Sequence, residues 1–346
     1  MSNPRHPLAG ALIAAVVVLA AAVGILAMVG RDITGEQGSG LPAAFQYDLE
    51  GIKRIDAALI RYRQAAELPL ALTEARAVAV GPRDRIYVAG DKTILVLEPA
   101  GAKLPPIALE EEPHALAIGG DEHAHPERIY VCMPRHVEVY DAAGKRLASW
   151  EDLGPKAILT SIALAERDVL VADAGNRIVY RFDTAGKLLG RIGRRNPQEK
   201  IYGFIIPSPY FDVAVSADGL VRVANPGAHR IEAYTLDGHL ETMWGQHADS
   251  IEGFCGCCNP ANFAILPDGR FVTAEKGIPR VKVYSEDGKL DCVVAGPETL
   301  APGATIVEET RPEHRLPVVD VAADSRGRVL VLDPGAGKVR VFELKR

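Results

Sequence analysis

The sequence predicts an all-β, six-bladed β-propeller preceded by one N-terminal transmembrane helix. Three observations lead to this fold class. A unit of short apolar strands recurs along most of the 346 residues, Asp-Gly and Ala-Gly turns separate the strands, and a long uncharged run lies near the N-terminus. Together they divide the chain into a membrane anchor at 1–31, a linker at 32–57 and a propeller at 58–346.

The overall composition is that of an ordinary globular protein. Hydrophobic residues make up 48% of the chain and charged residues 24%, and the formal net charge is −6. No run of Lys or Arg interrupts this balance. Because phosphate binding needs a basic patch, we expect no nucleic-acid partner.

The membrane anchor is predicted from residues 8–30, LAGALIAAVVVLAAAVGILAMVG, which carry no charge. At about 1.5 Å per residue such a helix crosses a hydrocarbon core of about 30 Å, and it is longer than most signal-peptide apolar regions. The small residues at 20–22 leave cleavage as an alternative. Arg5 precedes the span, whereas Arg31 behind it is offset by Asp32, which favours a cytoplasmic N-terminus. We therefore expect a single-pass membrane protein with an extracytoplasmic, periplasmic body.

The repeated unit consists of a strand around an alanine, a turn, a second strand, a short loop and a third strand ending in an aromatic residue or leucine. The anchoring alanines are Ala79, Ala117, Ala163, Ala214, Ala264 and Ala322, and the third-strand residues are Leu97, Tyr140, Phe182, Tyr234, Tyr284 and Phe342. Glycine provides the positive φ that tight turns between such strands require. A period of about 40–50 residues with four strands per unit is typical of propeller blades.

Two of the units resemble a known repeat. The third unit, VADAGNRIVYRFDTAGKLLGRIG, resembles the NHL repeat, and the fifth, LPDGRFVTAEKGIPRVKVYSEDGKL, is similar to a diverged copy. The resemblance covers about 58–346 and implies a six-bladed propeller. It implies no single function, because NHL propellers include protein-binding platforms, RNA-binding domains and a few enzymes.

The last blade is expected to borrow a strand from the N-terminal side of the propeller. The sixth unit has strands expected near 318–323, 328–332 and 338–343, and no fourth strand follows them. The missing outer strand is either 59–64 or 45–49, and 59–64 is favoured because it directly precedes the first inner strand. Such pairing closes the ring and covers an exposed edge.

Alternating strand directions sort the connections of each blade onto two faces. The simple glycine turns, which join strands one to two and three to four, lie on one side, here called the turn face. The connections between strands two and three and between blades lie on the other side, here called the loop face. It receives the segments 172–177, 207–212, 224–230, 253–260 and 274–280. Since binding sites on propellers usually lie on loops near the channel mouth, we expect one on the loop face at blades four and five.

The cysteine cluster lies on this face, at the entry to blade five. Cys255, Cys257 and Cys258 fall within four positions. Three alternatives stay open: a structural disulfide, a metal or cluster site with His229 as a possible fourth ligand, and a redox-active thiol site. A disulfide between the neighbours is expected to be strained, because adjacent Cα atoms lie only about 3.8 Å apart.

Further candidate binding residues lie on the same loops. They are Tyr210, Asp212, Asn225, His229, Arg230, Asn259, Glu275, Lys276 and Arg280. Asn225 and Glu275 share one repeat position, and Arg230 and Arg280 share another, so blade-to-blade hydrogen bonds and ion pairs are their first interpretation. Lys276 occurs only in blade five. With Glu275 and Arg280 it forms a candidate anion site or acid–base pair.

The remaining unusual residues receive structural interpretations. The H-x-H pair of DEHAHPE, at 121–127, is expected in a solvated insertion on the turn face. Cys132 and Cys292 fall on strands and are expected to be small core residues.

Three functions remain open at this stage. The preferred one is a non-catalytic binding or scaffold module that holds a protein partner or small ligand on the loop face beside a membrane. The second is a redox accessory protein using the CGCC loop through a thiol or a bound metal. The third is a lyase or hydrolase with a metal in the channel. No histidines recur on the inner strands, which leaves few neutral ligands for such a metal.

Overall fold

The computed structural model describes residues 16, 18–20, 49–199, 202–303 and 318–345. The chain divides into two compact units, Met1–Leu49 and Glu50–Arg346. In the first unit the described residues 16 and 18–20 are helical, and the rest of the predicted anchor lies outside the described residues. Within the described ranges, no helix has the length and apolarity needed to cross a membrane.

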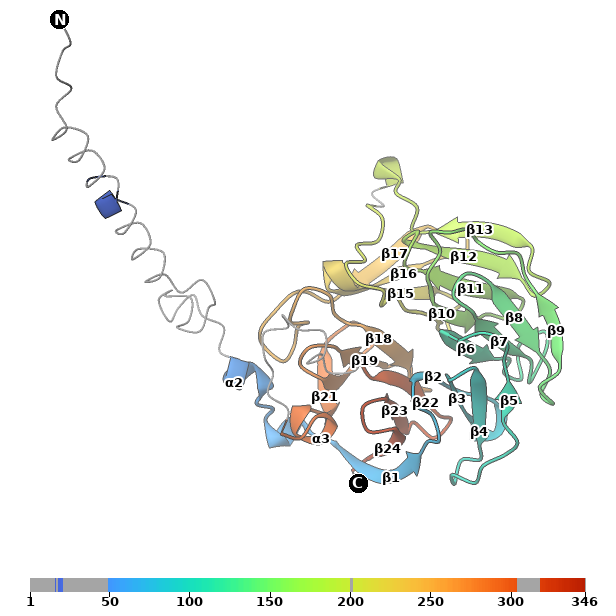
Figure 1. The fold of residues 1–346 in the computed structure, drawn as a ribbon, viewed down its shortest axis with the longest axis horizontal. Coiled ribbons are helices and arrows are strands. Elements are labelled where there is room, and N and C mark those ends of the chain that lie inside the picture. The colour runs from blue at the N-terminus through green and yellow to red at the C-terminus, as the bar shows by residue number, and fades with distance from the viewer. Residues whose placement is uncertain (1–15, 17, 21–48, 200–201, 304–317, 346) are drawn as a thin grey trace, which may run out of the picture. The chain divides into compact units, whose positions relative to one another are not determined.

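The second unit is a six-bladed β-propeller. Its described residues form six four-stranded antiparallel sheets arranged around a common axis (Figure 1). Blade one is β2 (Ala75–Val80), β3 (Ile86–Gly90), β4 (Thr93–Leu97) and β5 (Ile107–Ala108). Blade two is β6 (Ala115–Ile118), β7 (Ile129–Cys132), β8 (Val137–Tyr140) and β9 (Arg146–Ser149). Blade three is β10 (Leu159–Leu164), β11 (Asp168–Asp173), β12 (Ile178–Asp183) and β13 (Leu188–Ile192).

The next two blades follow the same order. Blade four is β14 (Val213–Val215), β15 (Val221–Asn225), β16 (Arg230–Tyr234) and β17 (Leu240–Trp244). Blade five is β18 (Asn262–Ile265), β19 (Phe271–Glu275), β20 (Arg280–Tyr284) and β21 (Leu290–Ala295). Short helices lie between or before the strands: α2 (Leu49–Lys53), η2 (Ala57–Leu59), η3 (Pro82–Asp84), η4 (Pro197–Glu199), η5 (Pro226–Ala228) and α3 (Pro297–Leu300).

Blade six closes the ring with a strand from the other end of the propeller sequence. It contains β22 (Asp320–Ala323), β23 (Val329–Asp333) and β24 (Lys338–Leu344), and β1 (Tyr62–Pro69) pairs antiparallel with β24. The predicted closure is therefore confirmed, but the predicted bounds 59–64 were too early. The reason is local: η2 continues to Leu59, and the Asp56 side chain caps it by accepting from Ala58 N at 2.9 Å.

The hydrophobic core lies between the blades. Six clusters of buried side chains each span two neighbouring blades, among the residues that the structure covers. The predicted third-strand residues are all buried; Tyr284, for example, is 1% exposed and Phe342 2%. Short strands rich in Val, Ile and Leu fit this arrangement because both faces of each blade are covered.

The predicted turns and inner strands are also confirmed. Gly219 and Gly269 adopt φ of 79° and 86°, a region that other residues rarely enter, at the tight turns after the first strands of blades four and five. Each anchoring alanine lies on the innermost strand of its blade.

The end of the predicted linker packs against blade five. Residues 51–53 are helical, and Ile52 forms a small buried cluster with Cys255 and Ile278. This contact makes α2 part of the surroundings of the cysteine loop.

Candidate functional site

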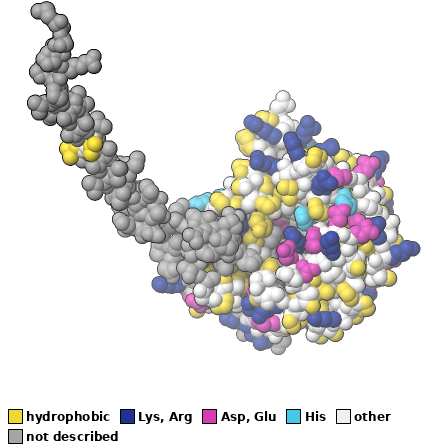
Figure 2. All heavy atoms as spheres, viewed as in Figure 1, with side chains coloured by type: hydrophobic (Ala, Val, Ile, Leu, Met, Phe, Trp, Pro, Cys, Tyr) yellow, Lys and Arg dark blue, Asp and Glu magenta, His cyan; other side chains and the backbone are white. Residues whose placement is uncertain are grey.

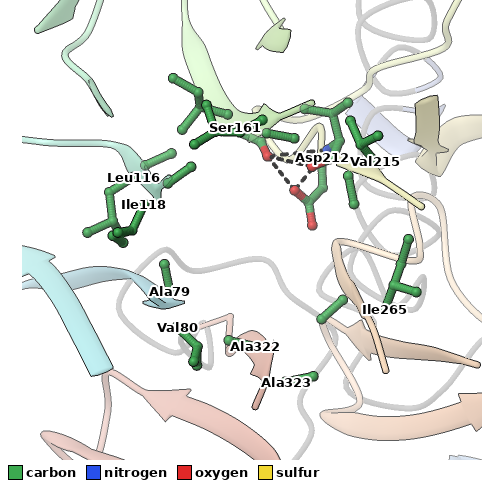
Figure 3. Close-up of a pocket in the computed structure, with 18 of the residues that line it drawn as sticks. Ala79, Val80, Leu116, Ile118, Ser161, Asp212, Val215, Ile265, Ala322 and Ala323 are labelled. Atoms are coloured by element: carbon green, nitrogen blue, oxygen red, sulfur yellow. Dashed lines mark hydrogen bonds between the residues drawn. The ribbon is translucent and has the colours of Figure 1, made fainter. Parts of the chain in front are cut away.

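A central cavity of about 940 Å³ lies among the six innermost strands and extends to the turn face. Figure 3 shows small and aliphatic side chains pointing into it, including Ala79, Leu116 and Ile265, together with the polar pair Ser161 and Asp212. The alanines that define the repeat therefore keep the channel open.

A set of polar side chains lines this cavity, two residues before the alanine of blades three to six: Ser161, Asp212, Asn262 and Asp320. Each of these side chains hydrogen-bonds to the following blade. Ser161 Oγ donates to Asp212 Oδ1 at 2.5 Å, and Asp212 Oδ2 accepts from Phe263 N at 2.7 Å. Asn262 Nδ2 donates to Val319 O at 2.9 Å, and Asp320 Oδ2 accepts from Val78 N at 2.8 Å. Asp212, a predicted binding residue, thus holds neighbouring blades together. The other three were missed, although their common offset from the alanines was a usable signal.

Burial changes the protonation of the two aspartates. It raises the pKa of Asp212 to about 6. Burial together with the nearby charge of Asp212 raises the pKa of Asp320 to about 7. A protonated carboxyl group is thus favoured in this part of the channel as the pH falls below neutral.

The repeated polar position at the end of the second strands is structural. Asp173 and Asn225 are fully buried, and their Oδ1 atoms each accept a backbone N–H at 2.9 Å, from Ile158 and Ile205 respectively. Each bond holds the incoming loop against the second strand of the same blade. The predicted blade-to-blade role was therefore wrong for Asn225, because the N–H that its side chain accepts belongs to the loop entering its own blade.

Arg230 has a similar local role. Its Nε donates to Glu232 Oε1 at 2.6 Å, and Asn225 Nδ2 donates to the same oxygen at 2.9 Å. Both predicted binding residues thus share one buried carboxylate within blade four.

In blade five the corresponding residues form a buried charge network. Arg280 Nε donates to Glu275 Oε2 at 2.9 Å, and Lys282 forms an ion pair with the other oxygen of Glu275. All three side chains are at most 1% exposed. Glu275 and Arg280 are thus turned into the blade, and of the three residues predicted to form an anion site only Lys276 remains on the loop face.

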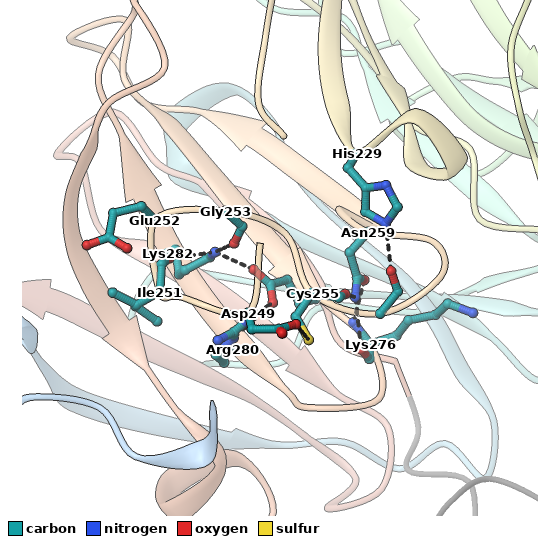
Figure 4. A network of polar contacts seen from close by, with 12 residues as sticks. His229, Asp249, Ile251, Glu252, Gly253, Cys255, Asn259, Lys276, Arg280 and Lys282 are labelled. Carbon is teal, nitrogen blue, oxygen red and sulfur yellow. Dashed lines mark hydrogen bonds and ion pairs between the residues drawn. The ribbon is translucent and has the colours of Figure 1, made fainter. Parts of the chain in front are cut away.

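The same network anchors the segment before the cysteines. Figure 4 shows Lys282 directed at Gly253, whose carbonyl accepts from Nζ at 2.6 Å, and Ile251 O accepts at 3.0 Å. Burial lowers the pKa of Lys282 to about 8, against the opposing charge of Glu275. A buried cation thereby fixes the path of the loop at 251–253.

The three clustered cysteines are free thiols with different surroundings. Cys255 is 9% exposed and packs against Ile52 and Ile278, and burial raises its pKa. Cys257 is exposed and Cys258 is buried. Their Sγ atoms lie 3.1 Å apart. The two neighbours therefore approach each other.

Cys258 is surrounded by polar donors from two blades. Ser208 Oγ, on the loop entering blade four, donates to Cys258 Sγ at 3.4 Å, and Lys276 Nζ donates to Ser208 Oγ at 3.1 Å. Lys276 Nζ also lies 5.4 Å from the centre of the Tyr210 ring, within cation–π range. Segments 207–210, 257–258 and 276 thus meet on the loop face.

His229 and Asn259 hold the backbone of the cysteine loop. His229 Nε2 lies 2.6 Å from Gly256 O (Figure 4). The His229 ring stands edge-on to that of His247, with 4.9 Å between the ring centres. Asn259 Nδ2 donates to Cys255 O at 2.7 Å, and its Oδ1 accepts from Lys276 N at 2.9 Å. Throughout the described ranges, no three His, Cys, Asp or Glu side chains converge as a metal-ligand set.

A second cavity of about 400 Å³ lies at the loop-face mouth of the channel. Its lining includes Arg76, His114, Ile158, Tyr210, Phe211 and Pro334. His114 contacts Leu159 O through Nδ1 at 2.9 Å, and burial lowers its pKa. Arg76 and His114 were not identified from the sequence, although both lie three residues before an anchoring alanine.

Exposed hydrophobic side chains also distinguish the loop face. Within the described part of the propeller, the large exposed hydrophobic residues on loops are Ile158, Tyr202 and Ile205. Tyr202 is 72% exposed and Ile205 52%, and both belong to the long connection from β13 to β14. This connection also carries Ser208 and Tyr210, so it links the exposed apolar residues with the thiol pair.

The insertion on the turn face differs from its prediction. His123 is 6% exposed, lines the central cavity and packs edge-on against Tyr130 at 5.5 Å. The expectation of a solvated H-x-H pair was therefore wrong for His123, because the inserted chain folds back over the end of blade two.

Figure 2 shows charges of both signs interspersed on the face toward the viewer, which therefore presents no strong field of one sign.

No protein-family model and no curated protein matches the sequence. Solved structures do share the fold. A protein of unknown function from Bacteroides thetaiotaomicron aligns with TM-score 0.55 and 15% identity, over 83% of this chain and 72% of that one. A streptogramin B lyase aligns with TM-score 0.53 and 11% identity, over 84% and 100%. Virginiamycin B lyase from Staphylococcus aureus gives 0.52 and 12%, over 82% and 99%. At these identities the likeness shows the fold alone.

Proposed function

We propose that this chain is a membrane-tethered, extracytoplasmic NHL-type propeller that binds a partner protein through its loop face at blades four and five. The tether is the uncharged run 8–30, which is long enough to cross a bilayer. The body then lies beside the membrane, on the side opposite the positively charged N-terminus.

One observation carries the choice of face. The exposed large hydrophobic residues on the described loops gather on this side of the propeller, where Ile158, Tyr202 and Ile205 belong to the loops entering blades three and four. The second cavity is lined by Ile158 together with Tyr210, and the cation Lys276 lies over the Tyr210 ring. Apolar anchors surrounded by polar groups are the usual composition of a protein-binding surface.

A reaction in the central channel has less support. Two of the structural neighbours are named as lyases, and Asp212 and Asp320 are among the carboxyl groups that line the channel of this chain. However, Asp212 and Asp320 each use both oxygens to accept hydrogen bonds that join or order the inner strands. Their positions are explained by the assembly of the blades.

The proposal is tested with two substitutions matched in exposure. Ile205 is 52% exposed on the loop face, and Met243 is 50% exposed on β17, the outer strand of the same blade. A charge at either position costs the fold little, because both side chains already contact water. We expect Ile205→Asp to reduce the size of the complex that the full chain forms in mild detergent extracts of its own membranes, measured by gradient sedimentation, and Met243→Asp to leave it unchanged. Equal sedimentation of the wild type and Ile205→Asp contradicts the proposal.

A further inference from the structure

The cysteine loop separates its thiols into one packing residue and one reactive pair. Cys255 lies in an apolar cluster with Ile52 and Ile278. Cys257 is exposed, Cys258 is buried, and their Sγ atoms are 3.1 Å apart. An exposed thiol 3.1 Å from a buried thiol suits thiol–disulfide exchange, because one sulfur can meet the substrate and the other can resolve the intermediate.

The surroundings of Cys258 favour its thiolate. Ser208 Oγ donates to Cys258 Sγ at 3.4 Å, and Lys276 Nζ supports Ser208 from 3.1 Å. Burial alone raises the pKa of Cys258, but hydrogen bonds from Lys276, Ser208 and Cys257 outweigh burial and lower it. The hydrogen bond to Cys258 is the main reason that the pKa of Cys257 is raised. Within the pair, the proton is therefore held more tightly by Cys257 than by Cys258.

The distance between the sulfurs favours sulfur chemistry over a shared metal. Two thiolates on a tetrahedral zinc ion, each at about 2.3 Å, lie about 3.8 Å apart. The observed separation of 3.1 Å is shorter than this. His229, the residue predicted to complete a metal site, is engaged with Gly256 O through Nε2 at 2.6 Å.

We propose that Cys257 and Cys258 form a thiol–disulfide exchange pair whose substrate is an accessible disulfide, with Cys257 as the attacking and Cys258 as the resolving thiol. This activity goes beyond partner binding and does not depend on it, because a small disulfide reaches the exposed sulfur directly.

The exchange balances in three steps. Cys257 passes its proton to the Cys258 thiolate and attacks one substrate sulfur; the substrate S–S bond breaks, one thiolate leaves, and a mixed disulfide remains on Cys257. Cys258 then gives its proton to the departed thiolate. Finally Cys258 attacks Cys257 Sγ and releases the second substrate thiolate. The substrate is reduced by two electrons, and the pair is oxidised to a disulfide.

The same chemistry runs in reverse when the oxidised pair meets a dithiol. A disulfide between neighbours is strained, since their Cα atoms lie about 3.8 Å apart, below the usual disulfide range of about 4.4–6.8 Å. Strained disulfides are readily reduced. The reverse direction therefore transfers the disulfide to a dithiol substrate and restores the two thiols.

Lys276 is a positioning residue in this scheme. Its Nζ touches Ser208 and favours the thiolate of Cys258 without meeting the substrate. Lys289, in the turn between the third and fourth strands of the same blade, is a matched control, because it is 82% exposed and pairs with Asp287.

The test uses the full chain in mild detergent and an aromatic disulfide that releases a coloured thiol. We expect wild-type protein to release two thiols per chain and to become lighter by two hydrogen atoms, with Cys257 and Cys258 both protected from alkylation. Cys258→Ser should release one thiol and retain a stable mixed disulfide on Cys257. Lys276→Met should slow the reaction near neutral pH and move the pH–rate midpoint upward, because less of Cys258 is then thiolate at a given pH. Lys289→Met should change neither.

Three results overturn the proposal. They are a wild-type product that stops at a mixed disulfide, consumption of Cys255 in place of the pair, and a Lys276→Met profile identical to that of the wild type. The trapped Cys258→Ser adduct is read by mass and does not require a rate, so it remains informative if Lys276→Met lowers stability.

Discussion

Closure of the ring by β1 predicts a large and specific cost for removing Tyr62. This residue is 2% exposed and packs in the cluster between blades five and six, next to Phe342 of β24. A buried aromatic side chain removes about 150–250 Å² from water, which at about 25 cal/mol per Å² corresponds to about 4–6 kcal/mol. Alanine retains about 1 kcal/mol of this, so Tyr62→Ala should lower the free energy of unfolding by about 3–5 kcal/mol, the usual range for such truncations.

The neighbouring residue supplies the control. Arg63 is on the same strand, but its side chain is 63% exposed and pairs with Glu343 at the surface. Arg63→Ala should cost less than about 1 kcal/mol, as exposed ion pairs do. Both variants are compared with the wild type by urea denaturation, followed by tryptophan fluorescence and circular dichroism together. A Tyr62→Ala loss no larger than that of Arg63→Ala refutes the closure by β1.

The other predictions concern the boundaries and the buried charges. Deleting residues 1–31 should move the protein from the membrane fraction to the soluble fraction without a loss of sheet signal. A chain beginning at Glu67 lacks the first five residues of β1 and should lose cooperative unfolding. Similar melting of these two shortened chains contradicts the role of β1 in closing the ring. Glu275→Gln should cost about 3–5 kcal/mol, because it leaves Arg280 and Lys282 buried without a counter-charge, and Glu286→Gln is the exposed control. The pKa of Asp320 is raised to about 7 from 3.8, so the folded state binds this proton more tightly than the unfolded state. The bound proton therefore stabilises the fold fully below the pKa of the unfolded chain, and this contribution is lost as the pH rises through 7. Asp320→Asn should make the fall in the free energy of unfolding between pH 5 and 8 smaller by about 2–3 kcal/mol, and an unchanged fall contradicts the assignment.

Sequence periodicity predicted the fold because each blade repeats the same local requirements. An apolar run, a glycine turn and a buried aromatic recur in register, so the alanines and third-strand residues could be assigned before any contact was known. The closing strand was placed three residues early. Its start depends on the capping of η2 by Asp56, a local contact without a counterpart in the other blades.

The candidate site was predicted less completely, because it depends on contacts between loops from different blades. The sequence identified the cysteine loop and Lys276, but Ser208, which donates a hydrogen bond to Cys258, lies 50 residues away in the chain. Glu275 and Lys276 are adjacent, yet one turns into the blade and the other toward the thiols. Such a division follows from the directions of the two side chains where β19 ends, which charge patterns do not specify.

Hydrophobic spacing also could not distinguish buried from exposed loop residues. Ile205 and Ile206 are neighbours, but Ile206 is 6% exposed and joins the core between blades three and four. Ile205 remains 52% exposed because its backbone is held by Asn225 and Gly227.

The central claim, a partner held on the loop face at blades four and five, is tested most directly by site-specific photo-crosslinking in intact cells. A photoreactive residue is placed at Tyr202 on the loop face and, in separate strains, at Leu147 on the outer strand β9, where the side chain is 46% exposed. We expect a discrete crosslinked species from Tyr202 that disappears when Ile205→Asp is added, and none from Leu147. Equal crosslinking from both positions, or a Tyr202 adduct that persists with Ile205→Asp, contradicts the claim.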